Sequence, residues 1–134
     1  MRARAAGLAG CMVGLALASC GTGADQREAR AAAERFYSAV QSEEGRSACA
    51  LLDEDTSTKL VKDEQTHDCA AAVLKLELRG TRADSVSVYA TAAQVHFAGG
   101  DTVFLGFTRN GWRIQAVGCR TVSGGGPLEC EEES

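Results

Sequence analysis

Cysteine is the residue type with the most obvious chemistry in this chain, which has six cysteines among 134 residues. Thiols form disulfides, bind metal ions or exchange electrons. A structural zinc site presents its ligands in two close pairs, and a redox dithiol has the spacing Cys-x-x-Cys. The sequence has no such pair, and His67, close to Cys69, has no further cluster of donors around it. We therefore expect no metal site, no redox site and no cofactor.

The first 19 residues have the layout of a secretory signal peptide. Arg2 and Arg4 form a short positive segment, and the run 5–18 that follows is apolar and uncharged. A permanent membrane-spanning helix needs about 20 apolar residues, so this run is too short to be one. A positive start followed by a short apolar stretch is instead typical of a signal that is removed after export.

The end of this segment, Leu17-Ala18-Ser19-Cys20, resembles the lipobox of the bacterial lipoprotein family, which has a leucine, two small residues and a cysteine. The resemblance implies cleavage before Cys20 and attachment of a diacylglycerol to its thiol. Two or more acyl chains anchor a protein stably, so the chain would be held at the cell membrane, facing the extracytoplasmic side. Residues 20–24 would be a short tether. The alternative is an ordinary secretory signal whose cleavage site includes a cysteine.

Cleavage at this position changes the length, the net charge and the number of cysteines of the chain. Removing 19 of the 134 residues leaves 115, and losing Arg2 and Arg4 moves the formal charge from −4 to −6. The remaining cysteines are Cys49, Cys69, Cys119 and Cys130. An even number of cysteines in an exported domain predicts disulfides, and four cysteines allow three pairings. We expect Cys49–Cys69 and Cys119–Cys130, because each pair lies within one local structural unit.

Length and composition exclude several classes of protein. A chain of 134 residues is too short for a multi-span transporter or a barrel enzyme. Its 14 basic and 18 acidic residues disfavour an electrostatic nucleic-acid interface. Its hydrophobic content of 45% argues against disorder. We therefore expect residues 25–130 to form one folded domain, whose partners are the membrane, through the lipid anchor, and a small-molecule ligand or an envelope protein.

The first part of this domain has the residue spacing of helices. Apolar residues recur at helical spacing over 26–41, after the N-cap candidate Asp25, and predict an amphipathic helix. Shorter apolar stretches predict three further helices at about 46–52, 58–65 and 69–76. Short helices are marginal by themselves, so we expect the Cys49–Cys69 bond to hold them together.

From Thr81 onward apolar and polar residues alternate, which predicts strands. The expected strands are four, at about 86–90, 93–97, 103–107 and 112–119, and the Asn110-Gly111 pair between the last two is the strongest hairpin signal in the chain. Sequential strands with short turns predict an antiparallel meander. The expected fold class is thus α+β, with N-terminal helices packed on a curled four-stranded meander and two disulfides. We expect residues 131–134 to be a mobile acidic tail.

This arrangement resembles the nuclear transport factor 2-like superfamily, also called the cystatin-like α+β roll. The residues that carry the resemblance are Glu34-Arg35-Phe36-Tyr37 in the first helix and Gly111-Trp112-Arg113-Ile114 in the last strand. The chain is also similar to small lipoproteins of high-G+C Gram-positive bacteria that have four similar cysteines. The superfamily contains isomerases and dehydratases with acid/base residues in an apolar cone, and also proteins that only bind, so the fold alone does not select an activity.

His96, Tyr89 and Asp101 are the candidate acid/base residues. Strand alternation places His96 opposite Val95 and Phe97, most simply on the solvent face. A closed roll would reverse this face and bring His96 into a cavity with Tyr89 and Asp101, as in an isomerase- or dehydratase-like enzyme. The sequence has neither a Ser-His-Asp order with a nucleophile elbow nor a His-Glu-x-x-His motif. We therefore expect a non-enzymatic binding domain, with the enzyme as the alternative.

Overall fold

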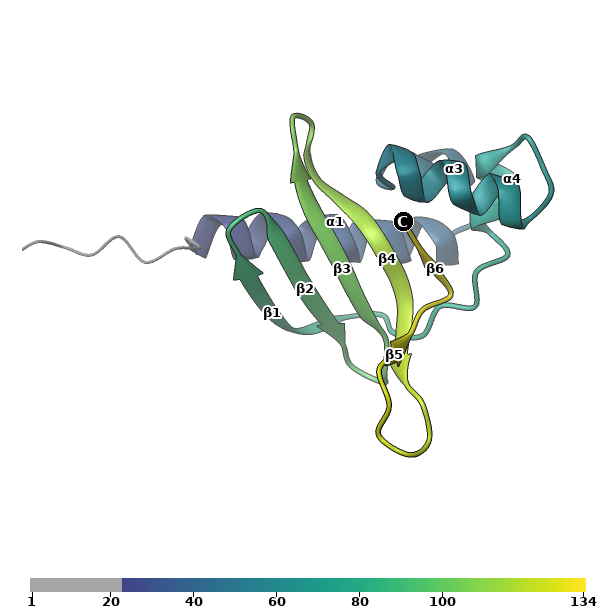
Figure 1. The fold of residues 1–134 in the computed structure, drawn as a ribbon. Helices are drawn as coiled ribbons and strands as arrows, with labels where there is room; N and C mark the ends of the chain where they lie inside the picture. The colour runs from purple at the N-terminus through teal and green to yellow at the C-terminus, as the bar shows by residue number, and fades with distance from the viewer. Residues whose placement is uncertain (1–22) are drawn as a thin grey trace, which may run out of the picture.

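The computed structural model describes residues 23–134, and its fold is α+β (Figure 1). Helices make up the first half of this range and an antiparallel sheet the second. The signal peptide expected at 1–19 and the lipidation residue Cys20 lie outside the described residues. Within residues 23–134, no helix has the length and apolar character needed to cross a membrane.

The helices of the described chain are α1 (Gly23–Gln41), α2 (Gly45–Cys49), α3 (Glu54–Asp63) and α4 (Cys69–Val73). Each was expected, but their ends differ from the prediction. The first helix includes Gly23 and Ala24, so the tether expected at 20–24 overlaps it. The third begins four residues earlier than expected because Asp53 caps it: its carboxylate accepts hydrogen bonds from the backbone N–H and the hydroxyl of Thr56, both at 2.8 Å.

α1 lies across one face of the sheet and contacts its four long strands (Figure 1). Its buried face is mostly alanine, and small side chains let a helix approach a sheet closely. The buried residues of this face are Ala29, Ala32, Ala33, Phe36, Tyr37 and Ala39. They pack on the apolar residues that alternate along the strands, among them Val95, Val103, Leu105 and Ile114, which together form the core. The amphipathic pattern of the sequence therefore identified the buried face of α1 correctly.

The sheet has six strands, two more than the sequence predicted. They are β1 (Ala83–Tyr89), β2 (Ala92–Phe97), β3 (Thr102–Thr108), β4 (Gly111–Thr121), β5 (Leu128–Glu129) and β6 (Glu132–Glu133). The order is β1-β2-β3-β4-β5, and β6 also pairs with β4. The β3–β4 hairpin closes at Gly111, whose φ of 87° is an angle that glycine adopts without strain.

The outer edge of β4 is covered along its length by three short segments. Near its start, the backbone N–H of Ile114 donates to the carbonyl of Leu51, and that of Asp53 donates to the carbonyl of Ile114, both at 2.9 Å. Further along, β6 and β5 pair with the same edge. An edge paired in this way presents no open backbone to another chain. The short helices and the C-terminal segment thus complete the sheet on this side.

The C-terminal residues 131–134 are not the mobile acidic tail that the sequence predicted. Glu132 pairs with Val117 of β4 and is only 4% exposed. Its carboxylate accepts a hydrogen bond from the Lys59 ammonium of α3 at 3.3 Å, and this contact raises the pKa of Lys59. A buried carboxylate needs such a partner. The prediction of a mobile tail was wrong because the partner that orders Glu132, Lys59, is 73 residues away in the sequence, and no local pattern indicates a contact over that separation.

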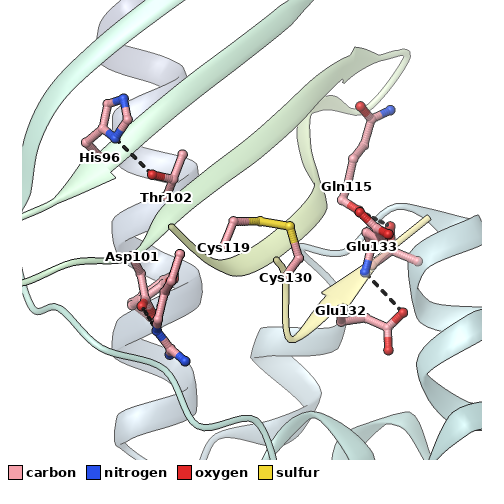
Figure 2. Close-up of a disulfide and its surroundings, with 11 residues drawn as sticks. His96, Asp101, Thr102, Gln115, Cys119, Cys130, Glu132 and Glu133 are labelled. Atoms are coloured by element: carbon pink, nitrogen blue, oxygen red, sulfur yellow. Dashed lines mark hydrogen bonds and ion pairs between the residues drawn. A yellow bond between two sulfur atoms is a disulfide. The ribbon is translucent and has the colours of Figure 1, made fainter. Parts of the chain in front are cut away.

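Both predicted disulfides are confirmed. Cys49–Cys69 joins the end of α2 to the start of α4, and Cys119–Cys130 joins β4 to the segment between β5 and β6 (Figure 2). They close sequence separations of 20 and 11 residues. The first bond holds together helices of five residues each, which would not persist alone.

Removing the Cys49–Cys69 bond should lower the free energy of unfolding by about 3 kcal/mol, because the unfolded chain gains the freedom of an open loop. The measurement is denaturant unfolding of the Cys49→Ser/Cys69→Ser double variant beside the unchanged chain. Non-reduced protein should also weigh four hydrogen atoms less than reduced protein, since two disulfides form. Four thiols free to react in the folded, non-reduced protein would contradict the pairing.

Candidate functional site

The structure does not bring the three predicted acid/base residues together. Tyr89, at the end of β1, is 67% exposed. His96 is half-buried on the sheet face opposite the core residues, and its Nδ1 lies 2.9 Å from the Thr102 hydroxyl. Asp101 is buried, and in Figure 2 it lies apart from the His96 ring. These positions leave no shared cavity for proton transfer among the three.

Asp101 is instead the centre of a buried polar cluster at the β2–β3 end of the sheet. Its Oδ1 lies 2.6 Å from Nε of Arg120 on β4. Its Oδ2 accepts hydrogen bonds from the Tyr37 hydroxyl of α1 at 3.1 Å and from the backbone N–H of Arg79, in the loop before β1. One carboxylate thus connects the helix, the loop, the hairpin and the last long strand.

Arg120 extends this cluster toward the C-terminal segment. Its guanidinium donates to Glu131 Oε1 at 3.0 Å, and also to the carbonyl oxygen of Glu77. The hydrogen bond to Asp101 raises the pKa of Arg120, so the charge is permanent. Because Glu131 follows Cys130, the ion pair and the disulfide hold the same segment.

Tyr37 donates to the cluster as a neutral phenol. Burial raises the pKa of Tyr37 well above its ordinary value, and the negative charge of Asp101 raises that pKa further. The ring stacks on Phe97 with centroids 4.0 Å apart. Asp101 is 1% exposed and both of its oxygens accept hydrogen bonds from within the fold, so a substrate has no access to it and we assign this cluster a structural role.

A groove lies at the opposite end of β3, between α1 and the β3–β4 hairpin, and extends to α2. It consists of two adjoining cavities of about 350 and 630 Å³, which share Arg35, Asn110 and Arg113 as lining residues. We call these two cavities together the α1 groove. Their volumes are in the range of small-molecule sites. No local pattern in the sequence indicated this groove, because its walls come from segments far apart in the chain.

The smaller cavity is rich in positive charge. Arg27 and Arg35 line it from α1, Arg113 lines it from β4, and Glu28 is the one carboxylate among its lining residues. None of the three guanidinium groups makes an ion pair with another residue of the described range 23–134. Glu44 adds a second carboxylate where the larger cavity continues toward α2.

Trp112 lines the same cavity and has an unused hydrogen-bond donor. The residue is 4% exposed, and its Nε1 is the one buried side-chain nitrogen or oxygen within residues 23–134 that has no hydrogen-bond partner. The indole packs edge to face with Phe107, at a centroid distance of 5.2 Å. Leaving a buried donor unpaired costs about 1–3 kcal/mol, so such a group calls for an acceptor. The indole N–H of Trp112 was not among the candidate groups predicted from the sequence.

The part of the chain that the structure describes holds no cluster of three or more histidine, cysteine or acidic side chains suited to a metal ion. His67 is exposed, and the four cysteines from Cys49 onward are all in disulfides. Comparison of the chain with protein-family models, with curated proteins and with solved structures gave no match.

Replacing Asp101 should destabilise the fold strongly. In Asp101→Asn, Arg120 loses its buried counter-charge, and we expect a loss of about 3 kcal/mol in the free energy of unfolding. Urea unfolding at neutral pH measures the loss. Asp84→Asn, an exposed carboxylate on β1, is the matched control and should change stability by less than about 0.5 kcal/mol. Equal stability of the two variants would contradict a structural role for Asp101.

Tyr37 should make stability fall at alkaline pH. Its folded-state pKa is raised, so the folded protein keeps the phenolic proton while the unfolded chain releases it near pH 10. The free energy of unfolding should therefore decrease above about pH 10, by up to about 1.4 kcal/mol per pH unit from this group. Tyr37→Phe should lose this part of the slope, and Tyr89→Phe should keep it. The same alkaline slope in both variants would show that Tyr37 is not the source.

Proposed function

We propose that the protein is a lipoprotein anchored in the cell membrane, whose extracytoplasmic α+β domain binds a ligand and does not catalyse a reaction. The location rests on Leu17-Ala18-Ser19-Cys20 and the apolar segment before it. The binding role rests on one observation, the α1 groove, whose three arginines have no carboxylate partner within residues 23–134 and whose Trp112 N–H has no acceptor. Within this range the Arg113 guanidinium donates only to the Trp112 carbonyl oxygen, at 3.0 Å, and so keeps further donors for a ligand.

The disulfides support an extracytoplasmic location. Such bonds form and persist in oxidising compartments and are rare in the cytosol. Both pairs of the domain are bonded: one bond joins α2 to α4, and the other joins β4 to the segment between β5 and β6. Lipidation of Cys20 would place this domain close to the bilayer, because only two residues separate Cys20 from the start of α1. Three residue steps of extended chain span at most about 11 Å.

Binding is favoured over catalysis because the groups suited to acid/base work are occupied or dispersed. Asp101 is buried with donors on both of its oxygens, the His96 ring contacts the Thr102 hydroxyl, and Tyr89 is 67% exposed. The guanidinium groups of the α1 groove donate hydrogen bonds and have no acceptor atom, so they can hold and orient an anion but do not serve as a general base.

The fold is compatible with this role. The four long strands run in sequential antiparallel order with α1 across one face, which supports the resemblance to the nuclear transport factor 2-like roll. A small-molecule ligand is favoured over an envelope protein because the polar groups of the α1 groove gather in cavities of small-molecule size.

Cys20→Ala should prevent processing when the chain is expressed in a bacterium that matures lipoproteins. We expect the wild-type chain to appear in the membrane fraction as 115 residues plus lipid, and the variant as an unlipidated, uncleaved precursor of 134 residues. Intact-mass spectrometry distinguishes the two products.

Cys11→Ala is the matched control, because it removes a thiol from the apolar run without changing the lipobox. This variant should be processed like the wild-type chain. Identical mature masses and membrane fractions for Cys20→Ala and the wild-type chain would contradict the proposed anchor.

A further inference from the structure

We infer that the α1 groove binds a phosphate-type oxyanion, held by Arg35, Arg113 and the indole N–H of Trp112, with Arg27 extending the positive rim toward the start of α1. This inference names the ligand class of the proposed binding site and therefore rests on the proposed function. Three features of the groove support the inference: its positive charge, the unpartnered N–H of Trp112 and its position near the start of α1.

The groove is positively charged, whereas the protein as a whole is negatively charged. The whole chain has a formal charge of −4, yet the smaller cavity brings three arginines together beside a single glutamate. Like charges gathered in one place repel each other unless an anion compensates them. Arg30 and Arg120 have carboxylates within 4.0 Å, and the other seven arginines of the described chain have none. Three of these seven line the same cavity, where their charges add. The missing counter-charge fits a bound anion.

The donor geometry favours an oxyanion with several acceptor atoms. Arg35 lines the cavity from α1, and Arg113 and Trp112 line it from β4, so residues that carry donors stand on both walls. Guanidinium groups bind phosphate and carboxylate oxygens in pairs, and a neutral indole N–H adds one further bond. A neutral ligand could satisfy Trp112 but would leave the arginines uncompensated. A phosphate group offers acceptors on several sides, so it can accept from more than one of these donors.

The position of the groove allows two sources of phosphate. Ala24, in the first turn of α1, lines the smaller cavity, and Cys20 precedes it by four residues. If Cys20 carries the anchor, the head group of a neighbouring phospholipid lies within reach of the cavity. A soluble phosphate compound could also enter, so the test has one arm for each source.

Trp112 is the only tryptophan of the chain, so its fluorescence reports on the groove directly. The full chain in non-ionic detergent micelles is titrated with inorganic phosphate and with glycerol phosphate, against sodium chloride of the same ionic strength. In the second arm, the full chain is reconstituted into phosphatidylcholine vesicles with or without phosphatidylglycerol. A saturable change with soluble phosphates, with phosphatidylglycerol or with both supports the inference and identifies the source. No change in either arm overturns it.

Charge variants separate a defined site from general attraction. Arg35→Gln and Arg113→Gln should each raise the Kd about tenfold, because each removes a charge-assisted hydrogen bond. Arg109→Gln is the matched control: it removes the same charge from the same hairpin, but Arg109 does not line the groove. Its Kd should stay within about twofold of the wild-type value. An equal loss in Arg109→Gln and Arg113→Gln would overturn the site.

Trp112→Phe removes the indole N–H and keeps an aromatic ring. Titration calorimetry should show a Kd raised about fivefold, and thermal unfolding checks that the variant is folded. An unchanged Kd in the folded variant would remove Trp112 from the site. The anchor is tested separately by the mass of the Cys20 variants. If the wild-type chain is lipidated but the titrations fail, the ligand class is rejected and the anchor stands. If the wild-type chain is found without lipid but binds soluble phosphate, the anchor is rejected and the ligand class stands.

Discussion

The fold depends on the burial of one carboxylate, Asp101, whose negative charge is compensated by Arg120. A buried charge is costly without a partner, and this one draws its donors from α1, from the loop before β1 and from β4. Arg120 in turn reaches Glu131, beside the Cys119–Cys130 bond. The helix, the hairpin and the C-terminal strands therefore keep their relative positions through a single charged cluster and one disulfide.

The two ends of the sheet differ in how completely their polar groups are paired. At the Asp101 end both carboxylate oxygens accept hydrogen bonds, so Asp101 and its partners are held in place and have no role in binding or catalysis. At the β3–β4 end the arginines of the α1 groove have no carboxylate partners within residues 23–134, and Trp112 has a buried N–H without an acceptor. Stability requires the first kind of arrangement and binding requires the second. This contrast is the physical basis for proposing the groove as the binding site.

Local signals in the sequence were sufficient for much of the fold. The apolar stripe predicted α1, the alternation predicted the long strands, and short separations predicted both disulfides. Contacts between distant residues could not be predicted in this way. Tyr37 and Asp101 are 64 positions apart, and Lys59 and Glu132 are 73 apart, so nothing local indicated that a glutamate near the end of the chain is buried. The groove was missed for the same reason, because its arginines belong to α1 and to β4.

The most direct measurement is the NMR signal of the Trp112 indole N–H in the isotope-labelled full chain, recorded while phosphate is added. The chain has one tryptophan, so one indole signal reports on one site. Binding in the α1 groove predicts that this signal moves downfield and saturates, together with the side-chain signals of Arg35 and Arg113, while those of His96 and Tyr89 stay in place. Shifts at His96 and Tyr89 with an unmoved indole signal would contradict the assignment of the groove as the binding site.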